Sequence, residues 1–286
     1  MSGSPQQSEL ARATALTWNL AQRNIKAQFN GTVFGRLWSL VNPLVTIAVF
    51  SVVFGLIFSG RAPAGSNSGV DSFAMWIAVG VVTWTFISSA ISAGMSALTG
   101  NAGLLEKVYF PRYVLVVSTV LSTMVTFATE LGVLVIIMCF VGGPMVLAYV
   151  PLGIVFILLL AMFCTGVGLL LSIAVVWFRD IEHLWGLVTQ VWMYASGVVF
   201  PVTLIESAQQ KLFELGWGIG GQPLPLVLLF QLNPAEQFLE AFRNLFYDFA
   251  VPGPHVWIAC TAWAFGMLVV GALVFRAKQE RIVEEL

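Results

Sequence analysis

Few side chains of this sequence could carry out chemistry, and several of them lie in one short charged turn, Arg179–His183. In it, Asp180 and Glu182 are two residues apart. Such a carboxylate pair could serve as acid and base in a membrane-embedded glycosyltransferase, or could be charges that stabilise the start of a helix. The second interpretation is simpler. His183 and His255 are predicted to lie on opposite sides of a membrane, so they cannot share a metal ion.

Motifs for nucleotide, metal or covalent chemistry are missing from the sequence. It contains no Gly-x-x-x-x-Gly-Lys-Ser/Thr phosphate loop, and no Gly-Lys dipeptide occurs anywhere. Cys139, Cys164 and Cys260 lie in apolar runs without metal-ligand spacing, which favours buried free thiols. We therefore predict a conduit that is not an enzyme and binds neither a metal nor a cofactor itself.

Composition places the chain in a membrane. Of its 286 residues, 58% are hydrophobic and 9% charged, and the mean hydropathy is +0.90. Soluble domains carry about 25% charged residues. No basic block suited to nucleic acid is present, and residues 1–36 lack the short apolar core of a cleavable signal peptide.

The hydrophobic pattern predicts an all-α integral membrane protein, one domain with six transmembrane helices. Each run can cross a hydrocarbon core of about 30 Å, the fifth only just. The runs are 37–59, 72–98, 114–141, 151–177, 184–200 and 256–275. Residues 1–8 are expected to be disordered, and residues 9–30 to form an amphipathic helix in the membrane interface.

The region between the fifth and sixth runs has its own pattern. Val202–Leu215 and Leu226–Leu232 are too short to span, and a glycine/proline break separates them, which fits a re-entrant hairpin on the outer side. Asn233-Pro234 predicts a capped helix start. That helix should present an apolar face made of Phe238, Leu239, Phe242, Leu245 and Phe246.

Basic residues predict the orientation. Six spans put both termini on one side; Arg61, Lys211 and Arg243 fall on the opposite side and the other basic residues on the side of the termini. Because Lys and Arg favour the cytoplasmic side, both termini are predicted to be cytoplasmic, in a multi-pass protein of the inner (plasma) membrane.

A charged segment joins the second and third predicted spans on the cytoplasmic side. Pro111 would end its small helix before the next span. One interpretation is an amphipathic elbow lying on the membrane. The other is a coupling segment on which a cytoplasmic partner pushes, helped by Arg179 and Asp180; its contact residues would be Leu104, Leu105, Glu106, Lys107, Tyr109, Phe110, Pro111 and Arg112.

Aromatic and hydroxyl side chains share helix faces in two spans. In the fifth span these are Trp185, Thr189, Trp192 and Ser196, with Tyr194 beside them; in the first they are Trp38, Asn42 and Thr46. Helix packing is one explanation. The other is a path for sugars, which stack on rings and need partners for their hydroxyls, since an unpaired hydroxyl in hydrocarbon costs roughly 2–7 kcal/mol.

Glu130 is predicted to lie in the middle of the third span. An intramembrane carboxylate is a functional candidate by default. It could equally be protonated or hydrogen-bonded between helices, and the sequence leaves both interpretations open.

Several segments, taken in order along nearly the whole chain, resemble one family. They are Arg23-Asn24-Ile25-Lys26, Gly31–Trp38, Asn42-Pro43, Val53-Phe54-Gly55, Val108–Arg112, Trp177–Ile181, Asn233-Pro234 and Phe242-Arg243. The set is similar to permeases of type-2 ABC exporters that move polysaccharides: O-antigen, capsule, teichoic acid or, in mycobacteria, cell-wall galactan. The Ala/Val-rich, Lys-poor composition favours an actinobacterial galactan exporter. The family pattern has an acid near Thr126, whereas here the carboxylate is Glu130, one turn on.

The resemblance implies a homodimer with two copies of a separate ABC ATPase, which would hold ATP and Mg²⁺. The substrate would be a polyprenyl-linked polysaccharide that enters from the inner leaflet and leaves through a channel between the two copies. Three rivals remain: an exporter of drugs or lipids with the same architecture, a membrane enzyme of polyprenyl-sugar metabolism, and an ATP-independent channel.

Overall fold

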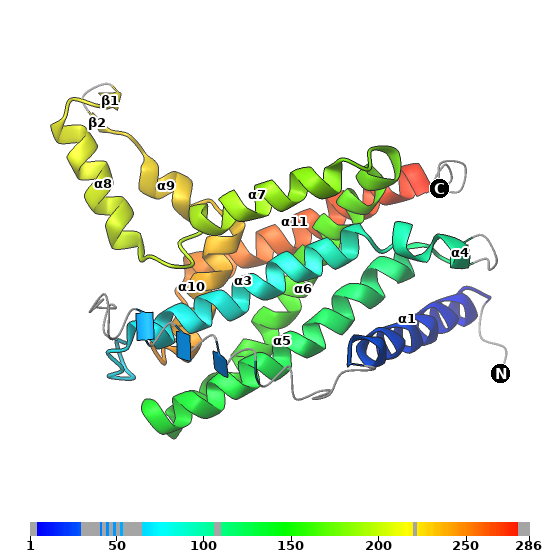
Figure 1. The fold of residues 1–286 in the computed structure, drawn as a ribbon, viewed down its shortest axis with the longest axis horizontal. Helices are drawn as coiled ribbons and strands as arrows, with labels where there is room; N and C mark the ends of the chain where they lie inside the picture. The colour runs from blue at the N-terminus through cyan, green and yellow to red at the C-terminus, as the bar shows by residue number, and fades with distance from the viewer. Residues whose placement is uncertain are drawn as a thin grey trace.

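The computed structural model describes residues 5–29, 41, 44–45, 48–49, 52–53, 65–105, 110–219 and 222–279. Long helices lie side by side in a bundle, and a shorter arm extends from one end (Figure 1). The start of α1 and the end of α11 lie at the other end of the bundle. The side of the membrane on which the termini lie stays a prediction.

Four helices are long and apolar enough to cross a membrane among the residues described. They are α3 (Phe73–Met95), α5 (Tyr113–Val141), the continuous segment of η4 and α6 (Pro144–Tyr149 and Val150–Trp177), and α11 (Pro254–Lys278). Their ranges coincide with the predicted spans 72–98, 114–141, 151–177 and 256–275.

The six-span prediction is not reproduced at the fifth run. Helix α7 covers Ile181–Ala195, 15 residues, or about 22 Å at ~1.5 Å per residue, short of a ~30 Å hydrocarbon core. It ends because Gly197 adopts a left-handed φ of 64°, the usual glycine signal after a helix C-terminus. The predicted first span, 37–59, lies largely outside the described residues, of which the isolated ones between 41 and 53 are helical.

The arm consists of α8 (Val202–Glu214), the antiparallel pair β1 (Gly218–Ile219) and β2 (Gln222–Pro223), and α9 (Leu226–Gln231). Both helices fall within the predicted hairpin pieces; the strand pair was not predicted. The arm points away from the bundle (Figure 1). Whether it re-enters a membrane stays a prediction.

Helix α10 (Pro234–Phe246) closes the core at the arm end. Asn233 caps it by accepting a hydrogen bond from the Ala235 N–H at 3.0 Å, as predicted. All five residues of its predicted apolar face are buried. They pack with α3, α5, α6 and α11 into the main hydrophobic cluster.

Helix α1 (Pro5–Phe29) lies beside α5 at the end where the termini meet. It starts at Pro5, within residues 1–8 that were expected to be disordered, because proline is tolerated in the first turn of a helix, where its missing N–H would have no partner. Ala13, Leu20 and Ala21 are buried and Trp18 is exposed, so one side packs on the bundle. Its place in a membrane interface stays a prediction.

Candidate functional site

The predicted coupling segment lies at the end of the bundle where the termini meet. After α3, η3 (Thr99–Asn101) and α4 (Ala102–Leu105) lead into it. Leu104, Leu105 and Phe110 are half-buried and pack on a cluster contributed by α1, α5, α6 and α11. Pro111 is exposed. The apolar residues therefore anchor the segment to the helices. Glu106, Lys107 and Tyr109 lie outside the described residues.

Helix α1 is tied to the same segment by a polar contact. Arg23 Nη2 donates a hydrogen bond to Asn101 Oδ1 at 3.1 Å, and Asn101 Nδ2 donates to the Ala97 carbonyl at 2.9 Å. Arg112 Nη1 is buried and finds no hydrogen-bond partner within the described part of the chain. Helix α1 is therefore linked to η3, which leads into the coupling segment.

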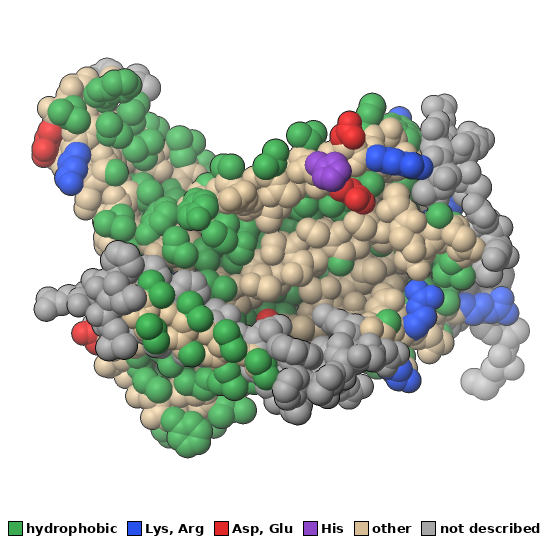
Figure 2. All heavy atoms as spheres, viewed as in Figure 1, with side chains coloured by type: hydrophobic (Ala, Val, Ile, Leu, Met, Phe, Trp, Pro, Cys, Tyr) green, Lys and Arg blue, Asp and Glu red, His purple; other side chains and the backbone are tan. Residues whose placement is uncertain are grey.

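The second predicted coupling turn comes to this end as well. Arg179 and Asp180 are exposed between α6 and α7. Ser96 Oγ, just after α3, donates a hydrogen bond to Glu182 Oε1 at 3.2 Å. The structure thus connects the start of α7 with the end of α3, from which the chain leads into the first coupling segment. Lys and Arg side chains gather mostly at this end (Figure 2).

The aromatic and hydroxyl stripe of α7 faces the bundle. Trp185, Thr189 and Trp192 are half-buried, and Ser196 is buried. Trp192 meets Trp84 of α3 edge to face, with ring centroids 5.5 Å apart. Thr189 and Ser196 donate to carbonyl oxygens of α7 itself, each at 2.7 Å. In this arrangement the hydroxyls are already satisfied, and a role in a substrate path stays a prediction.

The opposite side of α7 is apolar and exposed. Leu187 is 64% and Val191 69% exposed, and Leu184, Val188 and Tyr194 lie on this side with them. Tyr194 therefore lies apart from the buried stripe that it was predicted to widen. Trp38, Asn42 and Thr46, the first-span candidates, lie outside the described residues.

Helix α10 holds the end of α7 through two side chains that the sequence hypothesis did not assign to the site. Asn233 accepts from Trp192 Nε1 at 2.8 Å and donates to the Ala195 carbonyl and to Ser196 Oγ. Arg243 donates to the Gly197 and Val198 carbonyls at 2.8–3.1 Å. These bonds satisfy carbonyls left free where α7 ends. The sequence feature that could have pointed to this contact is a lone arginine on the apolar helix that starts at Asn233-Pro234.

Arg243 is half-buried in this position. Its guanidinium carbon lies 3.4 Å from the centroid of the Trp76 ring, a cation–π contact. Helix α10 is not one of the four candidate spans. Burial lowers the pKa of Arg243 to about 9, while the negative charges of Glu236, Asp248 and Glu240 act to raise it. The side chain remains a cation at neutral pH.

Glu236 lies on the same helix and is 8% exposed. Burial, and then the charge of Glu240, raises its pKa to about 7, while a hydrogen bond from Gln237 and the charge of Arg243 lower it. Gln237 Nε2 donates to Glu236 Oε2 at 2.9 Å and to the Gln231 carbonyl at 2.8 Å. This buried polar group joins α10 to the base of the arm.

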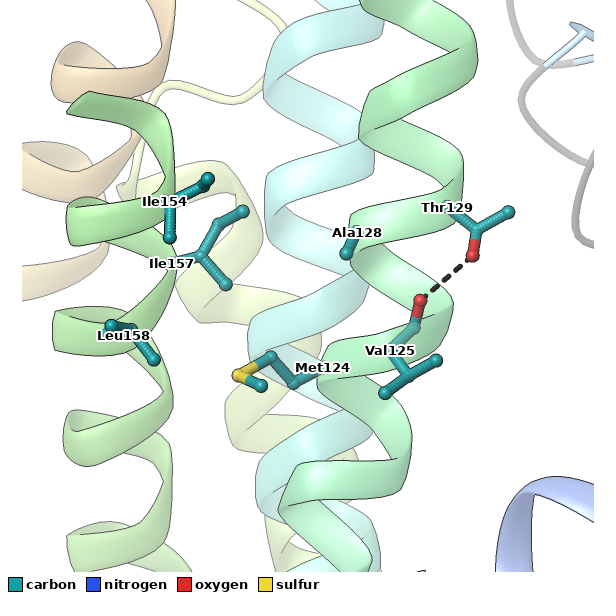
Figure 3. A pocket seen from close by; sticks show the side chains of 7 residues that line it. All are labelled: Met124, Val125, Ala128, Thr129, Ile154, Ile157 and Leu158. Atoms are coloured by element: carbon teal, nitrogen blue, oxygen red, sulfur yellow. Dashed lines mark hydrogen bonds between the residues drawn. The ribbon is translucent and has the colours of Figure 1, made fainter. Parts of the chain in front are cut away.

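The hollow between α5 and α6 is apolar. It has a volume of about 390 Å³ and is lined by Met124, Val125, Ala128, Thr129, Ile154, Ile157 and Leu158. Thr129 is its polar side chain, and the Thr129 hydroxyl donates to the Val125 carbonyl at 3.0 Å (Figure 3). The hollow therefore offers no free polar group to a sugar. Glu130, 9% exposed in α5, is not among the lining residues, and its role stays open.

Comparisons with known proteins identify the family of the chain. The model of the ABC-2 type transporter family matches residues 15–217. The chain belongs to the ABC-2 type transporter family. The match spans α1 to the arm, including both predicted coupling segments and α7.

Two curated relatives of this ABC-2 chain match it nearly end to end. It is 24% identical over 278 residues to the O-antigen export system permease protein RfbA of Myxococcus xanthus, covering 97% of this chain and 98% of the relative. It is 22% identical over 268 residues to the protein of the same name from Klebsiella pneumoniae, covering 93% of each.

Proposed function

We propose that this chain is the membrane permease of an ATP-driven exporter that moves a polyprenyl-linked polysaccharide out of the cytoplasm. The observation that carries the proposal is the similarity to O-antigen export permeases over nearly the full length of both partners, within a family that the chain belongs to. Cell-wall galactan and O-antigen-like glycans are the candidate substrates.

The energy source is a separate ABC ATPase that binds ATP and Mg²⁺. The sequence has no phosphate loop of its own, so the permease needs such a partner. The arrangement at the end shared by the termini supports a docking place there: Arg179, Asp180 and Pro111 are exposed, and Leu104, Leu105 and Phe110 transmit force into the cluster behind them.

The permease acts as a homodimer with two ATPase copies. One copy presents a long exposed apolar side on α7, and two copies about a two-fold axis can enclose a path for a glycan more readily than one. ATP binding would close the ATPases on the coupling segments and open the path between the two copies, with the arms at its outer side.

The test is purification of the tagged chain from its own membrane, combined with depletion in the cell. We expect a nucleotide-binding protein to co-purify and a polyprenyl-linked glycan to accumulate inside depleted cells. A drug or lipid exporter would instead leave the glycan pool unchanged. Catalytic turnover of a polyprenyl sugar by the isolated chain without ATP would replace the proposal with the enzyme alternative.

A further inference from the structure

Helix α7 is firmly held at the end that follows Ala195. Asn233 makes hydrogen bonds to Trp192, Ala195 and Ser196 at 2.8–3.1 Å. Arg243 adds the charged bonds to the Gly197 and Val198 carbonyls. Hydrogen bonds from a charged group are stronger than those between neutral groups, and here they are partly buried. This end is therefore fixed to α10.

Gly80 of α3 makes room for this contact. A Cβ atom at this position would approach Nη2 of Arg243 to 2.5 Å and the Val198 carbonyl oxygen to 3.0 Å. The guanidinium thus lies between the end of α7 and α3, which contributes Gly80 and the Trp76 ring. Helices α3, α7 and α10 meet there around one cation.

The opposite end of α7 is held far more weakly. The side-chain hydrogen bond found there among the described residues is the exposed one from Ser96 Oγ to Glu182 Oε1 at 3.2 Å. Because it is exposed to solvent, this bond contributes less to stability than the partly buried bonds at the other end. Asp180, Glu182 and His183 are all exposed. This end can be displaced at small cost.

Between its ends, α7 is packed on one side only. Trp185, Trp192 and Met193 contact the main hydrophobic cluster, and no residue from Ile181 to Ala195 is fully buried. Trp185 Nε1, on the inward face, is buried and lacks a hydrogen-bond partner in the described chain. A buried donor without a partner destabilises the protein, so a position of α7 that gives Trp185 a partner would be favoured.

We infer that α7 pivots about its Ser196 end, where Asn233 and Arg243 act as positioning residues, and that its Asp180 end moves. The inference rests on the proposed function, because the moving end carries the turn on which the ATPase would press. A swing about a fixed end displaces Trp185 more than Trp192, which is closer to the pivot.

The test uses reversible cross-links in the full complex with its ATPase, in a chain carrying Cys139→Ala. One variant, Ser96→Cys with Glu182→Cys, links the Asp180 end; the other, Ser196→Cys with Asn233→Cys, links the pivot. Each pair replaces one observed side-chain hydrogen bond, at 3.2 and 2.9 Å. A short bis-methanethiosulfonate reagent joins each pair, and a reductant releases it. The same variants without reagent control for folding.

Each linked variant is compared with the same variant without reagent. We expect the link at the Asp180 end to lower ATP-driven glycan export by about tenfold or more, with recovery on reduction. The link at the pivot, which replaces the Ser196–Asn233 bond removed by the substitutions, should not lower export further. Equal effects of the two links, or export at the uncross-linked rate with the Asp180 end linked, would overturn the pivot. A wild-type complex that hydrolyses ATP but exports no glycan would instead overturn the proposed function, and the pivot with it.

Discussion

Arg243 and Glu236 show how much of this protein depends on single polar residues in a mostly apolar surrounding. Arg243 is half-buried and donates to carbonyls at the end of α7, although its Nε has no partner among the described residues. Glu236 is buried and accepts from Gln237 of the same helix, which also donates to the Gln231 carbonyl in the arm. Burying a charge without such partners would cost several kcal/mol. Their positions therefore depend on the end of α7 and the base of the arm being in place.

Glu236 is expected to make the stability of the folded protein depend on pH. Its pKa is raised from 4.5 to about 7 in the folded protein. Between pH 4.5 and 7 the folded state holds a proton that the unfolded state has lost, so this group's contribution to stability falls as the pH rises through that window and is absent above it. At pH 8 the buried carboxylate is charged and destabilises the folded state.

Glu236→Gln should remove this pH dependence, because glutamine does not titrate. We expect its melting temperature at pH 8 to exceed that of the wild type by a few degrees, and the difference to disappear near pH 4.5, measured by tryptophan fluorescence of the purified complex. Glu214→Gln, at an exposed position on α8, is the control. A difference that is independent of pH would contradict the assigned titration.

The sequence predicted part of this residue-level picture. The Asn233 cap and the apolar face of α10 were predicted from the Asn-Pro pair and the helical spacing, and both are confirmed. The bonds from Asn233 and Arg243 to α7 were not, because they join residues about 40–50 positions apart in sequence, and a pattern of local spacing carries no information about such contacts.

At the scale of elements, glycines set how closely the helices approach. A Cβ at Gly166 of α6 would collide with the backbone of Met267 in α11, and a Cβ at Gly271 would collide with the Gly166 carbonyl. Small residues at such crossings let membrane helices pack backbone to backbone. Gly266 of α11, by contrast, has no atom within 4 Å of an added Cβ among the described residues.

Gly166→Ala should therefore separate α6 from α11. Overpacking of this kind costs about 1–3 kcal/mol, so we expect a lower melting temperature and less folded protein on size-exclusion chromatography in detergent. Gly266→Ala is the matched control and should leave both unchanged or slightly improved, since alanine favours a helix over glycine. Equal behaviour of the two variants would refute the close crossing.

Four spans were predictable at this scale because long apolar runs have few alternatives. The fifth was predicted to reach Phe200 because its apolar character continues that far. The helix ends at Ala195 because Ser196 and Gly197 form its C-terminal turn and Arg243 binds the carbonyls there. A hydropathy profile reports neither the glycine turn nor the contact with Arg243.

At the scale of the whole molecule, the two predicted coupling segments, the N-terminal helix and the described C-terminal end meet at one end of the bundle (Figure 1). The Arg23–Asn101 and Ser96–Glu182 bonds connect them. A partner that presses here would reach α1, α5 and α7 together. The arm, at the far end, would receive the motion only through the helices.

Phe110→Ala combined with Arg112→Ala should weaken this transmission. We expect export to fall by about tenfold, within the usual range of coupling free energies, and association with the ATPase to weaken as well, measured by co-purification. Phe213→Ala on the arm, at the far end of the bundle, controls for the loss of an aromatic ring and should leave ATPase association unchanged. If the double variant kept both export and association, the coupling assignment would be wrong.

The most direct measurement of the central claim is translocation in proteoliposomes that contain the purified chain with and without its ATPase. The account predicts that a polyprenyl-linked glycan crosses the bilayer when permease, ATPase, Mg²⁺ and ATP are all present, and that omitting the ATPase or the nucleotide stops it. Translocation at the full rate by the permease alone, without nucleotide hydrolysis, would contradict the account.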